Sequence, residues 1–232
     1  ADVVMTRGAN LTLNTATSSG GGIFIGRRGC FSMIGEGTTV GWNWANTDGG
    51  GIFADLDTVV KATGGRTKFG RDAYARIVEN KAIRSGGGLF IVDSTFIGTA
   101  VKIELNSVRN GHGGAVSVER KGVLRLVSSI VSMNGIMAEN GVGGAFAVRN
   151  RAAIWLDGCI VSYNVASEGG AIVATHRAEI HLRGGCTLEN NTASNLGGAV
   201  ALYDSSILHA KGGRLATNRA GITGGAVYAA DD

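Results

Sequence analysis

The chain has 232 residues, of which 39 are Gly and none is Pro; 44% of the residues are apolar and 17% are charged. Abundant glycine without proline or a Gly-X-Y period excludes collagen, and high apolar content with a net charge of only +4 excludes intrinsic disorder. Charged residues or glycine pairs interrupt every apolar stretch before it reaches the about 18 residues that a transmembrane helix needs. We therefore expect a folded chain with no membrane span in this segment.

The basic residues and the cysteines exclude further classes of protein. Lys and Arg are scattered among 18 acidic residues and form no basic block, so nucleic-acid binding is not expected. Cys30, Cys159 and Cys186 are too few for a disulfide scaffold and lack the C-x-x-C spacing of zinc sites. We expect no metal and no cofactor.

A repeat runs through the whole chain. Its first signal is a glycine pair followed by two residues that are mostly apolar, and it occurs eight times. The copies are Gly21-Gly22-Ile23-Phe24, Gly50-Gly51-Ile52-Phe53, Gly87-Gly88-Leu89-Phe90, Gly113-Gly114-Ala115-Val116, Gly143-Gly144-Ala145-Phe146, Gly169-Gly170-Ala171-Ile172, Gly197-Gly198-Ala199-Val200 and Gly224-Gly225-Ala226-Val227. Such self-similarity indicates a solenoid in which each copy is one rung.

An asparagine precedes each glycine pair at a similar distance. The eight are Asn14, Asn43, Asn80, Asn106, Asn134, Asn164, Asn191 and Asn218. At a tight bend Asn tolerates left-handed backbone geometry, and its amide can bond the backbone or the Asn of the next rung. We predict that these residues form a ladder along a buried bend, and that the glycines occupy a second corner where φ is positive.

Between these anchors, apolar and polar residues alternate with period two, which indicates strands. Each rung then holds about three short strands: one after the glycine pair, one around residues such as Leu124 and Leu126, and one leading into the Asn. Rungs of this kind stack as a parallel β-helix, with each strand pairing with its copy about 4.8 Å away. We predict an all-β, right-handed parallel β-helix of about eight rungs, forming a single domain over 1–232. No polar cap is evident at either end, so we expect a fragment of a longer chain or open ends that stack on neighbouring modules.

The strand after the glycine pair suggests an interaction surface. Counting from the second glycine, the residues at +2 and +4 are mostly large and apolar and are assigned to the core, so those at +1 and +3 should face outward. The outward set is almost free of charge and would form an apolar binding face. Its members are Ile23, Ile25, Ile52, Leu89, Ile91, Ala115, Ala145, Ala147, Ala171, Val173, Ala199 and Ala201.

Equal offsets in neighbouring rungs become neighbours in space. One such column is predicted to form an outer stripe of Arg125, Trp155, His181 and His209, where two histidines could chelate a metal and the Trp could stack on a sugar. A partly exposed polar face is the alternative interpretation. Another column stacks Cys159 on Cys186, which leaves both a disulfide and packed free thiols open.

The glycine tetrad combined with a motif such as Leu188-Glu189-Asn190-Asn191 resembles the repeats of chlamydial polymorphic outer-membrane proteins and of pectin-lyase-like surface β-helices. The family motif carries an aromatic residue where all eight copies have Leu, Val or Ile. The resemblance spans Asn10 to the C-terminus and implies a β-helix displayed at a cell surface.

Polygalacturonases, which are also right-handed β-helices, offer a second resemblance. Their Asn-Thr-Asp and Gly-His-Gly motifs match Asn46-Thr47-Asp48 and Gly111-His112-Gly113, which lie two rungs or about 10 Å apart. The Asp-Asp motif between them is missing, no Arg-x-Lys follows His112, and no column of carboxylates supplies the pair that a glycosidase needs. We therefore interpret Asp48 and His112 as solvated loop residues.

The expected function is a non-catalytic structural or adhesive module of an extracellular or cell-surface assembly, associating through the apolar face and the open ends. Its partners would be other protein chains of the assembly and an acidic polysaccharide, with no nucleic acid. Two alternatives remain open: a polysaccharide-active enzyme, and a flat-face module that binds carbohydrate or ice.

Overall fold

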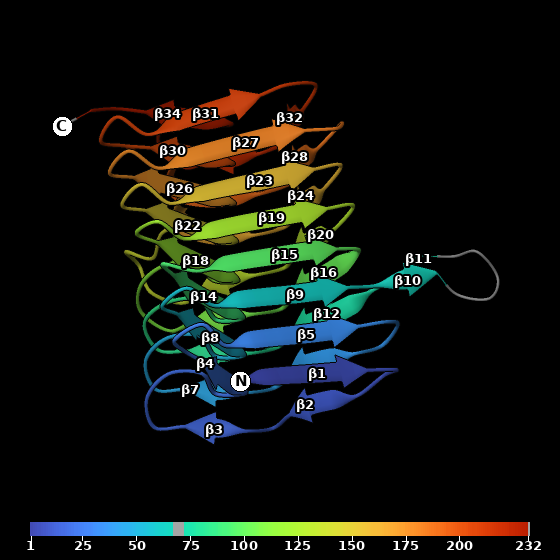
Figure 1. Cartoon of the computed structure of the whole chain (residues 1–232). Helices are drawn as coiled ribbons and strands as arrows, with labels where there is room; N and C mark the ends of the chain where they lie inside the picture. Colours follow the sequence, from blue (N-terminus) through green and yellow to red (C-terminus); the bar gives the residue numbers. More distant parts are fainter. Residues whose placement is uncertain (67–71, 232) are drawn as a thin grey trace.

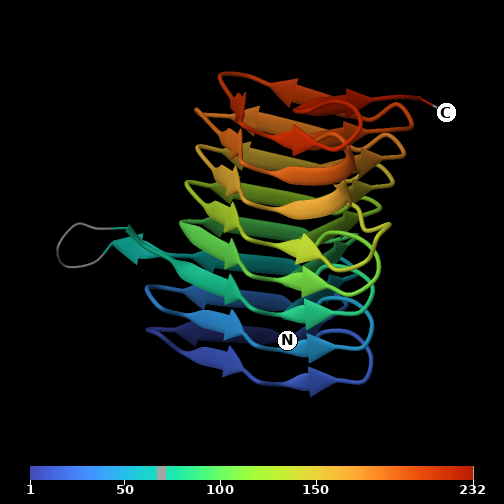
Figure 2. The ribbon, with the colours of Figure 1, turned by 180° about the vertical axis from the view of Figure 1, so that it is seen from behind.

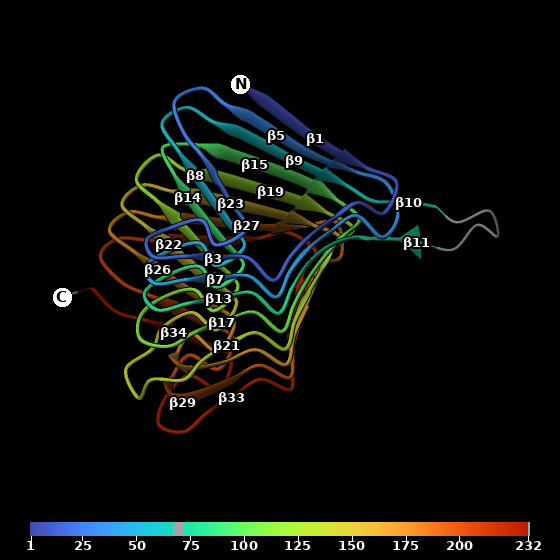
Figure 3. The same cartoon turned by 90° about the horizontal axis from the view of Figure 1, so that it is seen from below.

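The computed structural model describes residues 1–66 and 72–231. These residues contain strands and no helix, and the chain winds upward through eight rungs from the N-terminus to the C-terminus (Figure 1). Seen from below, each rung runs clockwise as the chain recedes from the viewer, so the solenoid is right-handed (Figure 3). The predicted fold class is confirmed.

Four parallel sheets, not three, run along the solenoid, and each contributes one strand to each rung. Sheet A consists of β1 (Asp2–Thr6), β5 (Cys30–Ile34), β9 (Val59–Thr63), β15 (Thr95–Thr99), β19 (Val123–Val127), β23 (Ala153–Asp157), β27 (Glu179–Arg183) and β31 (Ile207–Ala210). Sheet B consists of β2 (Asn10–Thr12), β6 (Thr39–Gly41), β12 (Ala75–Val78), β16 (Val101–Glu104), β20 (Ile130–Ser132), β24 (Ile160–Ser162), β28 (Thr187–Glu189) and β32 (Arg214–Ala216).

Sheets C and D complete each rung. Sheet C consists of β3 (Thr15–Ala16), β7 (Trp44–Ala45), β13 (Lys81–Ala82), β17 (Ser107–Val108), β21 (Gly135–Ile136), β25 (Val165–Glu168), β29 (Thr192–Leu196) and β33 (Arg219–Ala220). Sheet D consists of β4 (Ile23–Ile25), β8 (Ile52–Asp55), β14 (Leu89–Val92), β18 (Val116–Glu119), β22 (Phe146–Arg149), β26 (Ile172–Thr175), β30 (Val200–Leu202) and β34 (Val227–Ala229). Most strands of sheet C are only two residues long, too short to show alternation, so the pattern of the sequence did not predict this sheet.

One rung carries an insertion. Between β9 and β12 the chain leaves the solenoid in a small antiparallel pair, β10 (Gly65–Arg66) and β11 (Asp72–Ala73), which extends away from the body (Figure 1). This excursion explains why the third rung is longer than the others. The parallel pairing of β6 with β12 and of β12 with β16 passes undisturbed across the insertion.

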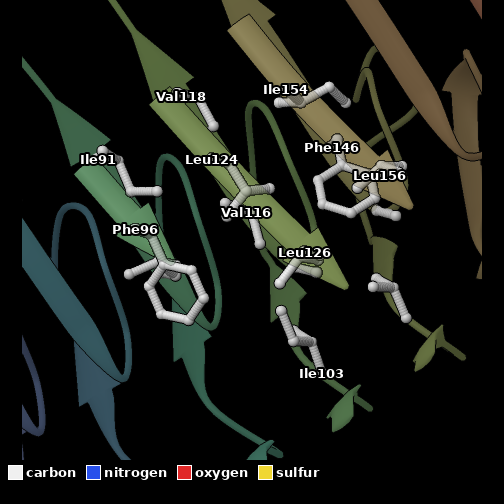
Figure 4. Packing of buried hydrophobic residues seen from close by; sticks show 14 of the residues in the cluster. Ile91, Phe96, Ile103, Val116, Val118, Leu124, Leu126, Phe146, Ile154 and Leu156 are labelled. Carbon is white, nitrogen blue, oxygen red and sulfur yellow. The ribbon is translucent and has the colours of Figure 1, made fainter. Parts of the chain in front are cut away.

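The core lies between sheets A, B and D. Alternate residues of each strand point into it, among them Phe96, Leu124 and Leu126 of sheet A and Phe146 of sheet D (Figure 4). The side chains form one continuous cluster from Ile25 to Leu202 because in-register stacking places each apolar residue against its copy in the next rung.

The asparagine ladder is confirmed. Each Asn side-chain amide donates to the Oδ1 of the Asn one rung further along, at 2.9 to 3.1 Å, from Asn14 through to Asn218. The same Oδ1 also accepts the backbone N–H of the preceding Asn, as Asn164 does from Asn134 at 3.0 Å. Asn43 to Asn191 are at most 1% exposed, so the ladder satisfies the polar groups of a buried bend.

The asparagines do not adopt the left-handed conformation that we predicted for them. The residue before each ladder Asn does, with φ between 53° and 62° in all eight rungs. The bend between sheets B and C can be followed along the back of the solenoid (Figure 2). From Asn43 to Asn191, the Asn side chain is buried on the inner side of this bend, whereas the residue before it is half-buried or exposed. Large apolar residues exposed at this corner are Leu13, Trp42, Leu105, Met133 and Tyr163.

The first glycine of each turn into sheet D has positive φ, as predicted for this corner. These are Gly20, Gly49, Gly86, Gly113, Gly143, Gly169, Gly197 and Gly224, with φ between 56° and 71°. The second glycine lies against the backbone of sheet C and of the next rung. Each turn thus needs one glycine for its conformation and the next for close approach.

The prediction of an apolar outer face is wrong. The strands register on the first glycine of a triplet, so that Gly-Gly-Gly of rungs 1–3 aligns with Gly-Gly-Ala of rungs 4–8, and Leu89 pairs with Val116 rather than with Ala115. Counting from the second glycine of each tetrad therefore shifted rungs 1–3 by one residue, and a one-residue shift exchanges the two faces of a strand. Ile25, Ile52, Leu89 and Ile91 belong to the core, and Ile23 packs against it.

The other residues of that set are also inaccessible. Ala115, Ala145, Ala171 and Ala199 are completely buried within the turns. Ala147, Val173 and Ala201 do point outward from sheet D, but they are at most 1% exposed and form a second, smaller cluster with Val142, Tyr203 and Tyr228. The segments that connect sheet C to sheet D fold back over this surface. The residues of the predicted set therefore form no accessible apolar face.

Candidate functional site

The connecting segments form a ladder of their own. The residues immediately before the first glycine pair in parallel bridges, Asp48 with Ser85, Ser85 with His112, His112 with Val142 and Val142 with Glu168. Because bridged residues in a parallel stack share an orientation, this column faces the outer surface of sheet D as a unit. The middle of the column is polar.

Asp48, Ser85 and His112 line a cavity of about 210 Å³. Glu119 and Arg149, which end β18 and β22, form its opposite wall, and they are paired through Arg149 Nη2 and Glu119 Oε1 at 2.6 Å. Asp48 and His112 are therefore not the solvated loop residues that we predicted: the Asp48 side chain is only 13% exposed, and His112 is half-buried.

Burial shifts the titration of both groups. It raises the pKa of the Asp48 carboxyl, and Arg84, whose Nε lies 4.0 Å from Asp48 Oδ1, and the Ser85 hydroxyl only partly oppose this. Burial lowers the pKa of the His112 imidazole, and the positive charge of Arg149 lowers it further. Relative to the unfolded chain, burial thus shifts both side chains toward their uncharged forms.

We predict opposite pH dependences for the two groups. Because the folded-state pKa of His112 lies below 6.5, its contribution to stability is present above pH 6.5 and is lost as the pH falls through that lowered pKa. Urea unfolding should show that the parent loses more stability than His112→Gln when the pH falls from 7.5 to 5.0. Equal pH dependence of the parent and His112→Gln would contradict the assignment.

Asp48 has the opposite dependence. Because the folded-state pKa of Asp48 lies above 3.8, its contribution to stability is present below pH 3.8 and is lost as the pH rises through the raised pKa. Asp48→Asn should therefore be more stable than the parent at pH 7.5.

The predicted stripe on sheet A is in register. Arg125, Trp155, His181 and His209 pair in succession, and the rings stack with centroids 3.6 Å apart for Trp155–His181 and 4.8 Å for His181–His209. His181, one rung further along, stacks on the Trp155 ring, and the guanidinium of Arg125, one rung before, lies 5.2 Å from the centroid of that ring. These contacts occupy the Trp ring within the stripe, which argues against a sugar-stacking platform. Among the described residues no cluster of three metal-ligating side chains occurs.

Cys159 and Cys186 are buried in adjacent rungs as unbridged thiols, and Cys30 is exposed. Burial is the main cause that raises the pKa of the Cys186 thiol to about 12, and the neighbouring Cys159 adds to it. A thiol with so little thiolate is a poor nucleophile.

We therefore predict that one thiol of three reacts quickly with a disulfide reagent in the native chain. All three should react after unfolding in urea without reductant. The Cys30→Ser variant should show no fast phase. A single reactive thiol in the unfolded chain would mean that Cys159 and Cys186 are bridged.

A groove runs along the turns that join sheet D to sheet A. Its volume is about 720 Å³, and it crosses five successive turns. Its lining residues are Asp93, Arg120, Lys121, Asn150, Arg151, His176, Arg177, Asp204 and Ser205. Backbone hydrogen bonds stack these turns, for example from Arg151 N to His176 O at 3.0 Å, so the side chains repeat along the solenoid at the rung spacing of about 4.8 Å.

The groove carries an excess of positive charge. Arg120 pairs with Asp93 at 3.1 Å, and His176 contacts Asp204 at 3.1 Å. Lys121, Arg151 and Arg177 form no ion pair with the described residues and lie on three consecutive turns. Arg151 and Arg177 hold φ of 64° and 61°, a conformation that arginine seldom adopts. Neighbouring turns hold the same conformation, for example at Asp204 and Ser205, so it belongs to the repeated turn.

Sequence reasoning missed both the groove and the cavity. The groove residues are not contiguous in the sequence and form no basic block. A signal for the cavity did exist: the column one residue before each first glycine reads Asp48, Ser85 and His112 in consecutive rungs.

Comparison with protein-family models, with curated proteins and with solved structures found no match to the chain. Its class therefore rests on the fold alone: it is a right-handed parallel β-solenoid. The described residues contain no helix that could cross a membrane.

Proposed function

We propose that the chain is a non-catalytic adhesive module of an extracellular or cell-surface assembly, and that its D–A turn groove holds a linear acidic polysaccharide. The row of unpaired cations, Lys121, Arg151 and Arg177, carries this proposal. A straight array with one positive charge per rung matches a polymer that bears carboxylate or sulfate groups at regular intervals.

The composition of the groove favours a polysaccharide over other polyanions. Asp93 and Asp204 lie on the two turns that flank the row, so the positive charge covers three turns and does not continue as a track for the phosphate backbone of a nucleic acid. Asn150 and Ser205 offer neutral donors and acceptors that suit sugar hydroxyls. Among the described residues, the groove lining includes no Phe, Tyr or Trp on which bases could stack.

Binding of polygalacturonate, alginate and a sulfated glycan tests the proposal, with dextran as the neutral control. We expect affinity for at least one acidic polymer that weakens steeply with added salt. The triple variant Lys121→Ser, Arg151→Ser, Arg177→Ser should bind at least about tenfold more weakly. A matched triple variant at exposed cations elsewhere, Lys61→Ser, Arg109→Ser and Arg214→Ser, removes the same charge and should bind nearly as well as the parent.

Three outcomes would overturn the proposal. The first is no binding to any acidic polymer at low salt. The second is equal weakening in both triple variants, which would mean that only net charge matters. The third is release of reducing ends or unsaturated products from the polymers, which would make the chain an enzyme.

A further inference from the structure

The polar cavity beneath the connecting segments is built from three directions. Asp48, Ser85 and His112 come from the bridged column, and Glu119 and Arg149 come from the ends of β18 and β22. Phe90 of β14 adds an apolar wall; its ring stacks on Phe53 at a centroid distance of 5.1 Å. Further lining residues include Arg84 and Asn110, and the Arg84 side chain is 68% exposed, so this side of the cavity reaches solvent.

Buried polar atoms without partners concentrate in this cavity. Among the described residues, four buried side-chain nitrogen or oxygen atoms lack a hydrogen-bond partner, and three of them belong to its lining: Asp48 Oδ1, His112 Nδ1 and Arg149 Nε. Such an atom destabilises the folded chain while it stays unsatisfied, and because these three have almost no accessible surface, a ligand reaches them only when the lining side chains move. Packing of the solenoid does not explain the cluster, because the neighbouring bridged position, Val142, is apolar and belongs to the small cluster outside sheet D.

The arrangement is not that of a hydrolytic triad. In such a triad the imidazole lies between the carboxylate and the hydroxyl, so that it can accept the hydroxyl proton while the carboxylate orients it. Here Ser85 lies between Asp48 and His112. The unpartnered atoms therefore indicate binding rather than nucleophilic catalysis.

The chemistry of the lining restricts the ligand. Two carboxyl groups, Asp48 and Glu119, face two guanidinium groups, Arg84 and Arg149, so the formal charges balance and a strongly charged ligand gains little. The unpartnered set contains an N–H donor on Arg149, a carboxyl oxygen on Asp48 and an imidazole nitrogen on His112. Hydroxyl groups satisfy such a mixed set because each can donate and accept. The volume admits one small molecule and not a polymer.

We propose that this cavity binds a single neutral sugar ring, with its hydroxyls on Asp48, His112 and Arg149 and its apolar face toward Phe90. This site is separate from the cationic groove and does not depend on it. The groove would hold an extended polyanion through charge, whereas the cavity would recognise one uncharged ring through directed hydrogen bonds.

The experiment uses the full chain and a panel of free glucose, galactose, mannose and xylose, with glucuronate as the charged comparison. Backbone amide resonances are followed by NMR during titration to about 100 mM sugar, which lies well above the millimolar affinities of weak binding. We expect saturable shifts at residues 84–86, 110–112, 119 and 149 with at least one neutral sugar. Methyl glycosides of that sugar then distinguish a free ring from the end of a glycan.

Two variants and a matched control locate the site. Arg149→Met and Asp48→Ala should each weaken the binding of the tightest-binding neutral sugar by about tenfold or more. Asp157→Ala, which removes an exposed carboxylate on sheet A, should leave that affinity unchanged. If a variant fails to fold, the shifts in the parent still decide the question. No saturable shift with any neutral sugar, shifts centred elsewhere, or tighter binding of glucuronate would overturn the proposal, and none of these results bears on polymer binding in the groove.

Discussion

Replacing Asn164 by Leu should lower the free energy of unfolding by about 4 kcal/mol. The substitution removes the Oδ1 that accepts both the backbone N–H and the side-chain amide of Asn134, at 3.0 Å each, and it leaves the carbonyl of Val131 without its donor at 3.1 Å. The side chain is completely buried, so water cannot replace these bonds. Each unsatisfied group costs about 1–3 kcal/mol.

Urea unfolding followed by circular dichroism measures this change. The matched control is Asn10→Leu, at an exposed position on β2, which should stay within about 0.5 kcal/mol of the parent. A loss below about 1 kcal/mol for Asn164→Leu would show that the ladder contributes little to stability.

Gly144→Ala should be comparably damaging, at about 3 kcal/mol or more, although it adds only one methyl group. A Cβ at Gly144 would collide with the carbonyl oxygen of Gly170 and would lie 2.7 Å from the backbone nitrogen of Val165. Both obstacles are backbone atoms held by the sheets, so neither can rotate away as a flexible side chain could. Relief requires sheets C and D to separate locally, with loss of ladder hydrogen bonds.

The control for Gly144→Ala is Gly65→Ala in β10, where an added Cβ meets no atom of the described residues within 4 Å and φ lies outside the left-handed region. That change should be neutral or slightly stabilising, because alanine restricts the unfolded chain more than glycine does. Thermal unfolding should separate the two variants by at least about 6 °C, given about 2–4 °C per kcal/mol for a chain of this length. Equal midpoints would show that the turn relaxes without cost.

The repeat made much of the architecture predictable. Each copy of the repeat forms one rung, so residues at equal offsets in neighbouring copies stack on one another. The Asn ladder and the Trp155–His181–His209 stripe follow from this. Both predictions depend only on differences between positions within the sequence, and stacking at about 4.8 Å converts these differences into contacts.

The face of the strand on which each side chain lies was harder to predict than the stacking of the rungs. Leu89 and Ala115 occupy the same offset from the second glycine of their tetrads, yet Leu89 pairs with Val116. A shift of one residue is small along the chain but reverses every side chain of a strand. The assignment of the outer face therefore failed, although the number of rungs and the fold class were predicted correctly.

The sequence by itself determined the period, the parallel stacking and the buried column of asparagines, because these follow from the spacing of like residues. The tertiary structure decided the path of the segments between sheets C and D, because that path depends on how they pack over Ala147, Val173 and Ala201. It is this path that brings Asp48, Ser85 and His112 opposite Glu119 and Arg149, residues from five different turns and strands. Likewise, only the stacked turns place Lys121, Arg151 and Arg177 in one groove, since about 30 residues separate each from the next along the chain.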